Sequence, residues 1–323
     1  MLFYKIKPTL TLYLLIIVLL SCAASISLSQ SLRYGGLIFD AMAQIDERTD
    51  FFKAIKKVRK SGVSKLALFA RSRKYLGQNE DEVLELGNNN KDLIILGSPK
   101  YFLLRDDLDE DYISITLENI IKYNYLFIGE ILYTHADKSH GEQTLRGERY
   151  VDPLQPGTRK FLNELSRFNI PVMTHWEVYN WKRDWPRFSK IYSEYRDLKF
   201  IIPHMAFGHP HQVEKILSVH PNVYMTISKK EKDQRSYSDR KKASKLGPGF
   251  LDSSRILRNS WALIFDRYQD RLLFATDAHK RRRWKKYRKI IRIYRKILGQ
   301  LPRQIAEKIA YKNAADLYGV IVE

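Results

Sequence analysis

The stretch "RLLFATDAH" (Arg271–His279) joins a short apolar run to a carboxylate and an imidazole that follow it directly. The run Leu272–Ala275 shows no alternation of polar and apolar residues, which predicts a strand buried on both faces, as in a parallel sheet. Asp277 and His279 then lie at the end of that strand. Because the same arrangement recurs upstream, this stretch indicates how the whole chain is organised.

Seven more apolar, β-branched runs of the same kind precede it. They are Leu37–Asp40, Lys65–Ala70, Asp92–Leu96, Tyr125–Ile131, Pro171–His175, Lys199–His204 and Val223–Ile227. Helical spacing marks the segments Phe51–Ser61, Asp111–Tyr123, Thr158–Phe168, Pro186–Tyr195, His211–Val219, Ser253–Tyr268, Lys286–Leu298 and Pro302–Leu317. Eight strands alternating with helices predict an α/β protein with a (β/α)8 TIM barrel. A doubly wound sheet is the alternative, but no Gly-rich phosphate loop follows the first strand.

The N-terminal residues predict an export signal or a membrane anchor. Lys5 and Lys7 precede the apolar run Leu10–Leu20, and small residues follow it. The run is short for a membrane span, which needs roughly 20 apolar residues. Cys22, the only cysteine, ends a stretch that resembles a bacterial lipobox and is a candidate for lipidation. We therefore expect residues 1–31 to be a leader and residues 32–323 to form one exported domain, either anchored to a membrane or periplasmic.

The charge of the chain implies an anionic partner. The formal net charge is +20, and much of it lies in Ser228–Lys245 and His279–Lys296. Nucleic acid is an unexpected partner for an exported protein, so an anionic membrane surface or an anionic small molecule is favoured. Arg282, in the second segment, is a candidate to bind a carboxylate or phosphate of the substrate. A solvated helix face is the alternative interpretation.

Four strand ends carry the side chains that could form a catalytic site. They are Glu130, His175, His204 and Asp277. In a TIM barrel these ends converge on one face, where the chemistry of this fold takes place. Two imidazoles and two carboxylates suit one divalent metal, most simply Zn²⁺. A structural, hydrogen-bonded histidine is the usual role of any one such residue taken alone.

The order of these residues resembles the amidohydrolase superfamily, in its amidohydrolase-related branch. "RLLFATDAH" and "IAYKNAADLYG" (Ile309–Gly319) are similar to that branch's last strand and closing helix. The resemblance implies a metal-dependent hydrolase or decarboxylase. By this match, His175 and His204 would be metal ligands and Glu130 would take the place of the bridging residue. Asp277 would be a ligand and the general base for a water that the metal activates.

The first strand departs from the family pattern. The two histidines expected in Asp-x-His-x-His fall on Met42 and Gln44, after Asp40. Met42 suits Zn²⁺ poorly at a hydrolytic site, and Gln44 offers a weak oxygen ligand. The metal position built on this strand is therefore lost or remade. Because three protein ligands and a water suffice for zinc catalysis, one metal remains chemically adequate.

Several polar and aromatic residues near these strand ends are candidates for substrate binding. They are His140, in the polar loop that follows the fourth strand, and Trp176, Glu177 and His279. Aromatic residues after His175 either stack on a ring of the substrate or pack a helix against the barrel. The sequence thus predicts a hydrolase of a small anionic molecule. A non-catalytic binding protein and a metal-independent enzyme remain as alternatives.

Overall fold

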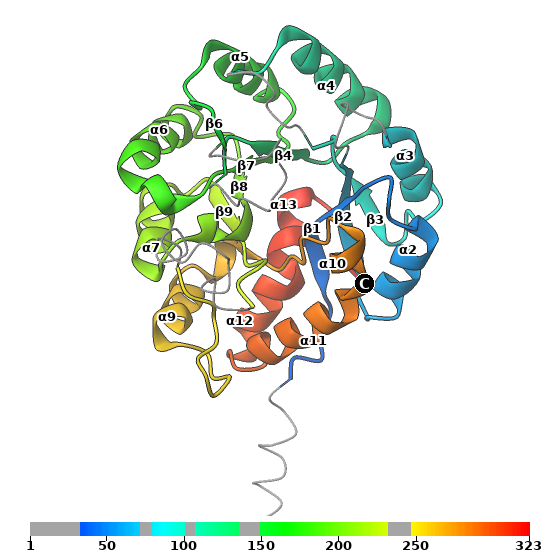
Figure 1. Ribbon diagram of the computed structural model, residues 1–323, viewed down its shortest axis with the longest axis vertical. Helices are drawn as coiled ribbons and strands as arrows, with labels where there is room; N and C mark the ends of the chain where they lie inside the picture. Colours follow the sequence, from blue (N-terminus) through cyan, green and yellow to red (C-terminus); the bar gives the residue numbers. More distant parts are fainter. Residues whose placement is uncertain (1–32, 72–78, 101–106, 136–148, 232–246) are drawn as a thin grey trace, which may run out of the picture.

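The computed structural model describes residues 33–71, 79–100, 107–135, 149–231 and 247–323. Its main strands form two parallel sheets, ordered β1-β2-β3 and β10-β9-β8-β7-β4. Their bounds are β1 Phe39–Ile45, β2 Lys65–Ala70, β3 Ile94–Leu96, β4 Ile128–Leu132, β7 Val172–His175, β8 Phe200–Ile202, β9 Val223–Thr226 and β10 Leu272–Leu273. The eight predicted strands are thus present, and the helices surround them as a ring (Figure 1).

Backbone hydrogen bonds join the edges of the two sheets. At one junction the amide of Leu126 donates to the carbonyl of Leu96 at 2.9 Å. At the other, the amide of Ala41 donates to Phe274 at 2.9 Å, and Ala43 forms a parallel bridge with Ala278. These contacts bring the first and last strands side by side, as the predicted TIM-barrel architecture requires.

The helices lie outside the strands and alternate with them along the chain. They are α2 Phe51–Arg59, α3 Glu80–Asn88, α4 Glu110–Tyr123, α5 Pro156–Leu165, α6 Trp181–Glu194, α7 Pro210–Val219, α9 Asn259–Arg267, α10 Arg281–Lys285, α11 Tyr287–Leu298, α12 Arg303–Glu307 and α13 Asn313–Tyr318. A π-helical turn, Lys308–Lys312, joins the last two, and a small hairpin pairs β5 Thr134–His135 with β6 Arg149–Tyr150. None of the helices in the described ranges is long and apolar enough to cross a membrane.

Three helices differ from what the sequence predicts, for local reasons. Helix α6 starts at Trp181, so Pro186 lies inside it and not at its first position. Helix α9 starts only at Asn259, because the carboxylate of Asp252 accepts from the amide of Ile256 and holds the preceding residues in a turn. Helix α3 was not predicted, because only Val83, Leu84 and Gly87 of its residues face the core.

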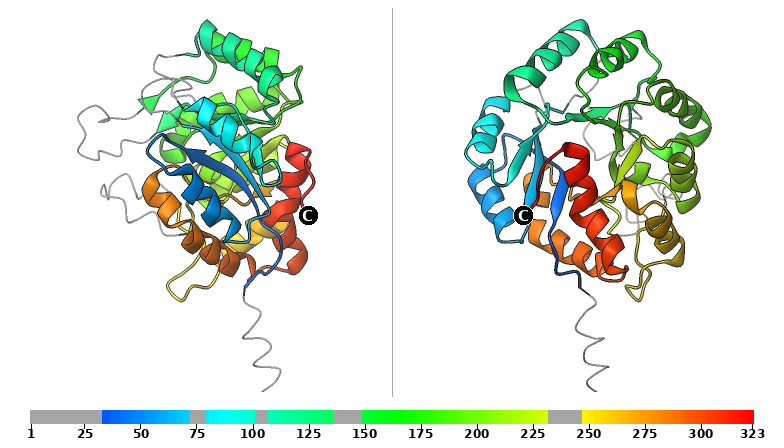
Figure 2. Two further views of the ribbon diagram at one scale, coloured as in Figure 1. Left: turned by 90° about the vertical axis from the view of Figure 1, so that its right-hand side faces the viewer. Right: turned by 180° about the vertical axis from the view of Figure 1, so that it is seen from behind.

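The barrel interior has its own apolar core. Large side chains from three strands and from the residue that precedes β4 meet there: Phe39, Phe69, Met173 and Phe127. The C-terminal helices lie across this end of the barrel in the view from behind (Figure 2). From them, Tyr318 packs on two of these rings and donates to the carbonyl of Ala41 at 2.8 Å. This core leaves the carboxyl ends of the strands for polar side chains.

A buried carboxylate ties the first strand to the last. Asp40 accepts hydrogen bonds from the amide of Thr276 at 2.8 Å, from its hydroxyl at 2.6 Å and from the hydroxyl of Tyr287 at 2.8 Å. Burial raises the pKa of Asp40 to about 6, although these neutral donors oppose the rise. Asp40 therefore holds the seam between β1 and β10 together and stays apart from the catalytic candidates.

Candidate metal centre and active site

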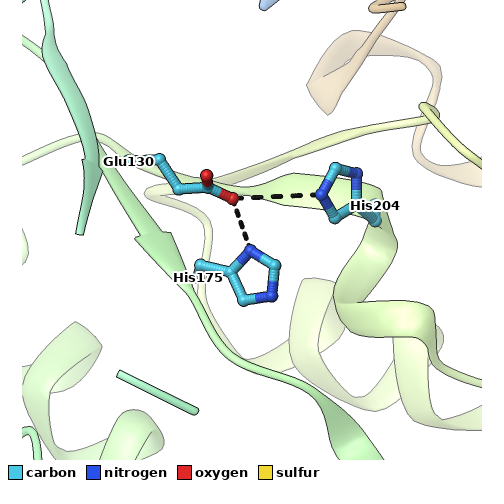
Figure 3. Close-up of side chains that lie close together, drawn as sticks. All are labelled: Glu130, His175 and His204. Atoms are coloured by element: carbon cyan, nitrogen blue, oxygen red, sulfur yellow. Dashed lines mark hydrogen bonds and ion pairs between the residues drawn. The ribbon is translucent and has the colours of Figure 1, made fainter. Parts of the chain in front are cut away.

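Three ligand-type side chains converge at the carboxyl ends of neighbouring strands. Glu130 lies in β4, His175 ends β7 and His204 follows β8. One ligand atom from each lies within 4.8 Å of the other two, and all three side chains are buried. Figure 3 shows both imidazoles directed at the same oxygen of Glu130. The sequence prediction that these three residues meet is consistent with this geometry.

The two oxygens of Glu130 face different partners. Oε1 is hydrogen-bonded to Nδ1 of His175, and Nε2 of His204 lies 3.9 Å from it. Oε2 accepts from Nε2 of Gln44 at 3.0 Å and forms an ion pair with Lys100. One side of this carboxylate is therefore occupied by hydrogen-bond donors of the protein. The other side faces two imidazoles that are themselves potential metal ligands.

Second partners fix the orientation of both imidazoles. Nδ1 of His204 lies 2.7 Å from Oγ of Ser228, which leaves Nε2 directed at Glu130. Nε2 of His175 lies 3.3 Å from Oε1 of Glu177, a fully buried carboxylate. Outer hydrogen bonds of this kind set the tautomer and orientation of metal-binding histidines. The cluster thus has the supporting contacts that such a site requires.

Asp277 lies beside this cluster and is surrounded by cationic and donor groups. Oδ1 accepts from Nε2 of Gln44 at 2.9 Å, and Oδ2 lies 2.5 Å from Nζ of Lys229 and 3.0 Å from Nδ1 of His279. Burial by itself raises the pKa of Asp277. His279, Lys229 and His204 together outweigh burial and hold the pKa well below its usual range. Asp277 is therefore ionised at neutral pH.

Gln44 links the two carboxylates from the first strand. Its Nε2 donates to both Glu130 and Asp277, so the amide nitrogen lies between the two negative groups. The indole of Trp284 donates to the backbone carbonyl of Gln44 at 3.0 Å and fixes this part of β1. The side-chain oxygen of Gln44 is buried and accepts no hydrogen bond within the described part of the chain. The amide N–H groups of Gln44 thus lie between two carboxylates, at a place where a cation could otherwise balance their charge.

Three residues of this site have a left-handed backbone. His204 has φ 58°, Lys229 has φ 59° and Asp277 has φ 46°. Non-glycine residues seldom adopt positive φ, and such strain concentrates at functional sites. The turn after β8 is left-handed over four successive residues, His204–Phe207. These conformations direct side chains from three strand ends toward one place.

Two lysines of the site were missed by the sequence analysis. Lys100 follows β3 and Lys229 follows β9, so both occupy strand ends like the residues that were chosen. Applying the same strand-end rule to the third and seventh strands would have identified them. Met42, one of the two residues that replace histidine, is fully buried in the barrel-interior core.

The predicted substrate-binding residues lie in different surroundings. The carboxylate of Glu177 lies against Nε2 of His175, on the side of the ring away from Glu130, and His279 contacts Asp277. Burial lowers the pKa of His279 to about 4, so this imidazole is neutral at physiological pH. Trp176 is fully buried and stacks on Phe188 with ring centroids 4.6 Å apart, which favours the packing alternative. Arg282 is exposed on α10. The substrate roles of all four residues stay predictions.

Two predicted positions lie outside the described residues. These are His140, in the loop that follows β5, and Cys22, the candidate for lipidation. Export, anchoring and the boundary between residues 31 and 32 therefore stay predictions as well.

The residues present fit a divalent metal ion at one position. One carboxylate oxygen and two imidazole nitrogens form a three-ligand set of the kind found at catalytic metal sites with an open coordination position. Among the described residues, a second position, between Glu130 and Asp277, holds the donor amide of Gln44. The described residues therefore fit a metal ion at the Glu130, His175 and His204 position.

The sequence pattern of the amidohydrolase family matches residues 134–320, which is more than half of the chain. The chain belongs to the amidohydrolase family. No curated protein matches this amidohydrolase.

Solved structures share its fold at low sequence identity. An uncharacterised TIM-barrel protein from Bordetella bronchiseptica is 13% identical with a TM-score of 0.56, and the match covers 82% of this chain and 81% of the other. A probable 2-pyrone-4,6-dicarboxylic acid hydrolase from Acinetobacter baumannii, with citric acid bound, is 14% identical with a TM-score of 0.55, covering 87% and 99%. A 2,6-dihydroxybenzoate decarboxylase from Rhizobium is 13% identical with a TM-score of 0.54, covering 88% and 99%. The amidohydrolase therefore has the TIM-barrel fold that its sequence predicts.

Proposed function

We propose that this amidohydrolase hydrolyses a small anionic molecule with the help of one divalent metal ion. Glu130, His175 and His204 would hold this ion, and Zn²⁺ is the metal that they suit best. The observation that carries this proposal is that the two carboxylate oxygens of Glu130 face different partners. One of its oxygens is occupied by donors from Gln44 and Lys100, and the other faces two oriented imidazoles. Two nitrogen ligands and one oxygen ligand suit Zn²⁺, and a fourth position stays open for water or substrate.

Asp277 supplies the general base in this proposal. The ion would polarise the scissile group and make water more acidic when it is bound. Asp277 is ionised and lies beside the cluster, so its carboxylate can accept a proton from the attacking water and pass it to the leaving group. Gln44 and Lys229 hold the Asp277 carboxylate in place from two sides.

Positive charge at the site favours an anionic substrate. Lys229 borders Asp277 and keeps 22% of its side chain exposed, so its ammonium group can reach a ligand. Lys100 adds a second positive charge on the far side of Glu130. Two structures of the same fold are named for carboxylate compounds, a pyrone dicarboxylic acid and a dihydroxybenzoate. We therefore infer a carboxylate-bearing substrate.

A metal-independent binding protein is the second candidate. The observation that favours it is that Glu130 and Asp277 each have a lysine partner without any ion, because Lys100 pairs with Glu130 and Lys229 pairs with Asp277. A carboxylate ligand could bind to the same lysines with no reaction. This candidate predicts ligand binding that is insensitive to chelators.

Metal content separates the two candidates. The full-length protein, purified in detergent without chelator, is compared with the double variant His175→Ala/His204→Ala. We expect about one ion per chain in the first and none in the second, because both imidazoles are needed to complete the ligand set. The matched control is His209→Ala/His211→Ala, which removes two histidines that stack on each other outside the cluster. No ion in any protein, even after incubation with Zn²⁺ or Mn²⁺, would exclude the metal-dependent proposal.

Catalysis is tested with a panel of lactones and esters that carry a carboxylate. We expect Asp277→Asn to keep the metal and to lose at least about a hundredfold in turnover, because it removes the general base. Equal turnover in the variant would exclude Asp277 from this role. Metal binding with no turnover of any compound would favour a binding protein that has kept its ion.

A further inference from the structure

Two neighbouring helices on the outer wall of the barrel carry only positive charges. Helices α2 and α11 contact each other and lie side by side (Figures 1 and 2). Every charged residue of either helix is lysine or arginine. The exposed basic residues of the two helices and of the residue that ends α2 form what we call the basic face: Lys53, Lys56, Arg59, Lys60, Arg288, Lys289, Arg292 and Lys296.

These charges are largely uncompensated within the protein. Of these eight, two form ion pairs with acidic side chains of the described residues: Lys53 with Asp50 at 2.8 Å and Arg59 with Asp92 at 2.6 Å. Elsewhere on the surface, exposed basic residues do have acidic partners. Lys160 pairs with Glu110 and Arg167 pairs with Glu164. The basic face thus differs from an ordinary solvated helix surface, where charges of both signs are mixed.

A large apolar side chain projects from the same surface. Phe52 precedes Lys53 on α2 and is 76% exposed. Lysine and arginine around an exposed aromatic ring are typical of helices that lie on a lipid surface, where the ring enters the headgroup region. Nucleic acid would satisfy the charges as well, but an isolated phenylalanine favours a lipid surface.

The chain also enters the fold at this face. The amide of Tyr34 donates to the backbone carbonyl of Arg295 at 2.8 Å, and the guanidinium of Arg295 donates to the carbonyl of Tyr34 at 3.0 Å. Tyr34 is therefore fixed against α11. The apolar run Leu10–Leu20 and Cys22 precede it in the sequence, and the residues from Cys22 to Tyr34 span at most about 40 Å.

We propose that the basic face binds the anionic headgroups of a lipid membrane, with Phe52 entering the headgroup layer. The guanidinium groups of Arg288 and Arg292 lie one helical turn apart and each can bind a phosphate with two hydrogen bonds. The metal cluster lies at the carboxyl ends of the strands and not on this wall, so the proposal is independent of the proposed function.

Vesicle binding by the full chain tests the proposal. Vesicles of neutral phosphatidylcholine are compared with vesicles that contain one quarter anionic phosphatidylglycerol, at low and at high salt. The test variant is Arg288→Gln/Lys289→Gln/Arg292→Gln/Lys296→Gln. The control is Lys160→Gln/Arg167→Gln/Lys182→Gln/Lys190→Gln, which removes the same charge from α5, the turn that follows it, and α6, on the opposite side of the ring (Figure 1). The N-terminal segment is the same in all three proteins, so its contribution cancels.

We expect the natural chain and the control to prefer anionic vesicles by at least about tenfold, and high salt to remove this preference. The test variant should lose the preference, and Phe52→Ser should weaken binding to anionic vesicles at constant charge. An equal loss in the control, no preference in the natural chain, or full preference in the test variant would each overturn the proposal. Loss of duplex DNA binding in the test variant, with vesicle binding unchanged, would overturn it in favour of nucleic acid.

Discussion

The two oxygens of Glu130 give a direct comparison between two regions of the barrel. Toward β1 and β3, Oε2 meets the amide of Gln44 and the ammonium of Lys100, which are groups the protein itself supplies. Toward β7 and β8, Oε1 meets two imidazoles held by Ser228 and Glu177. In the first region an amide N–H and a lysine compensate the negative charge of Glu130. In the second region two imidazole rings face the same carboxylate oxygen. Glu130 can therefore contribute to a metal-binding cluster on one side while protein donors compensate its charge on the other.

The largest effect should come from Glu130→Gln, because Glu130 belongs to both regions. We expect the free energy of unfolding to fall by about 3–5 kcal/mol, since Lys100 would lose its buried counter-charge. Metal binding should be lost as well. Urea unfolding and metal analysis measure the two effects. The matched control is Glu177→Gln, a carboxylate that is as buried and lies against His175. Equal losses in both variants would show that the ion pair adds nothing.

Asp40 sharpens the comparison, because it is a buried carboxylate held only by neutral donors. Its pKa in the folded chain is about 6 against an ordinary value of 3.8. The folded state therefore binds a proton more readily than the unfolded state, and the stability it contributes is lost as pH rises from about 4 to 6. The loss is about 3 kcal/mol, at 1.36 kcal/mol for each pKa unit.

Urea unfolding between pH 4 and pH 7 measures this slope. Asp40→Asn should remove it, because the variant has no carboxylate to ionise at this position. Asp197→Asn, an exposed position, is the control and should keep the slope. An unchanged slope in Asp40→Asn would assign it to another group.

Gln44→Glu is designed to break the difference between the two regions. A third carboxylate would replace the donor between Glu130 and Asp277. We expect the metal-free protein to lose about 2 kcal/mol from repulsion between buried like charges. Zn²⁺ or Mn²⁺ should restore the loss, because a cation can then take the place of the amide. Thermal unfolding with and without EDTA measures both effects. Gln304→Glu, an exposed position, should show neither. A metal-free variant as stable as the natural chain would contradict the role assigned to Gln44.

The smallest effect should come from Lys229→Gln. Lys229 is partly exposed, so we expect its loss to cost about 1 kcal/mol of stability or less. The pKa of Asp277 should rise, since Lys229 is one of the groups that lower it. Carboxyl resonances observed by ¹³C NMR would report this shift, and Lys182→Gln is the exposed control. An unchanged Asp277 titration would show that Lys229 does not lower its pKa.

Much of the fold was predictable because buried parallel strands have a local signature. Continuous apolar runs such as Lys199–His204 marked all eight strands, and the strand-end rule placed Glu130, His175, His204 and Asp277 on one face. Helix starts were less predictable. Helix α6 begins several residues before Pro186, the residue at which the sequence predicts its start. A turn capped by the Asp252 carboxylate delays the start of α9.

The partners of the site residues could not be predicted from the sequence. Lys100 and Lys229 lie 129 positions apart, and each reaches a carboxylate on a different strand. Which oxygen each lysine contacts depends on the distance and direction of side chains across the barrel, and no local pattern records these quantities. The left-handed conformations at His204, Lys229 and Asp277 likewise depend on the packing around them.

The sequence by itself determined the fold class, the family and the candidate ligands at the strand ends, because each of these depends on local periodicity or on short motifs. It also predicted that Met42 and Gln44 stand where the family has two histidines. Only the tertiary structure decided what the replacement does. It places Met42 in the apolar core, and it places the amide of Gln44 between two carboxylates from other strands. The physical reason is that a hydrogen bond requires two groups within about 3 Å, and only the packing of the strands around one axis brings residues so distant in sequence to that separation.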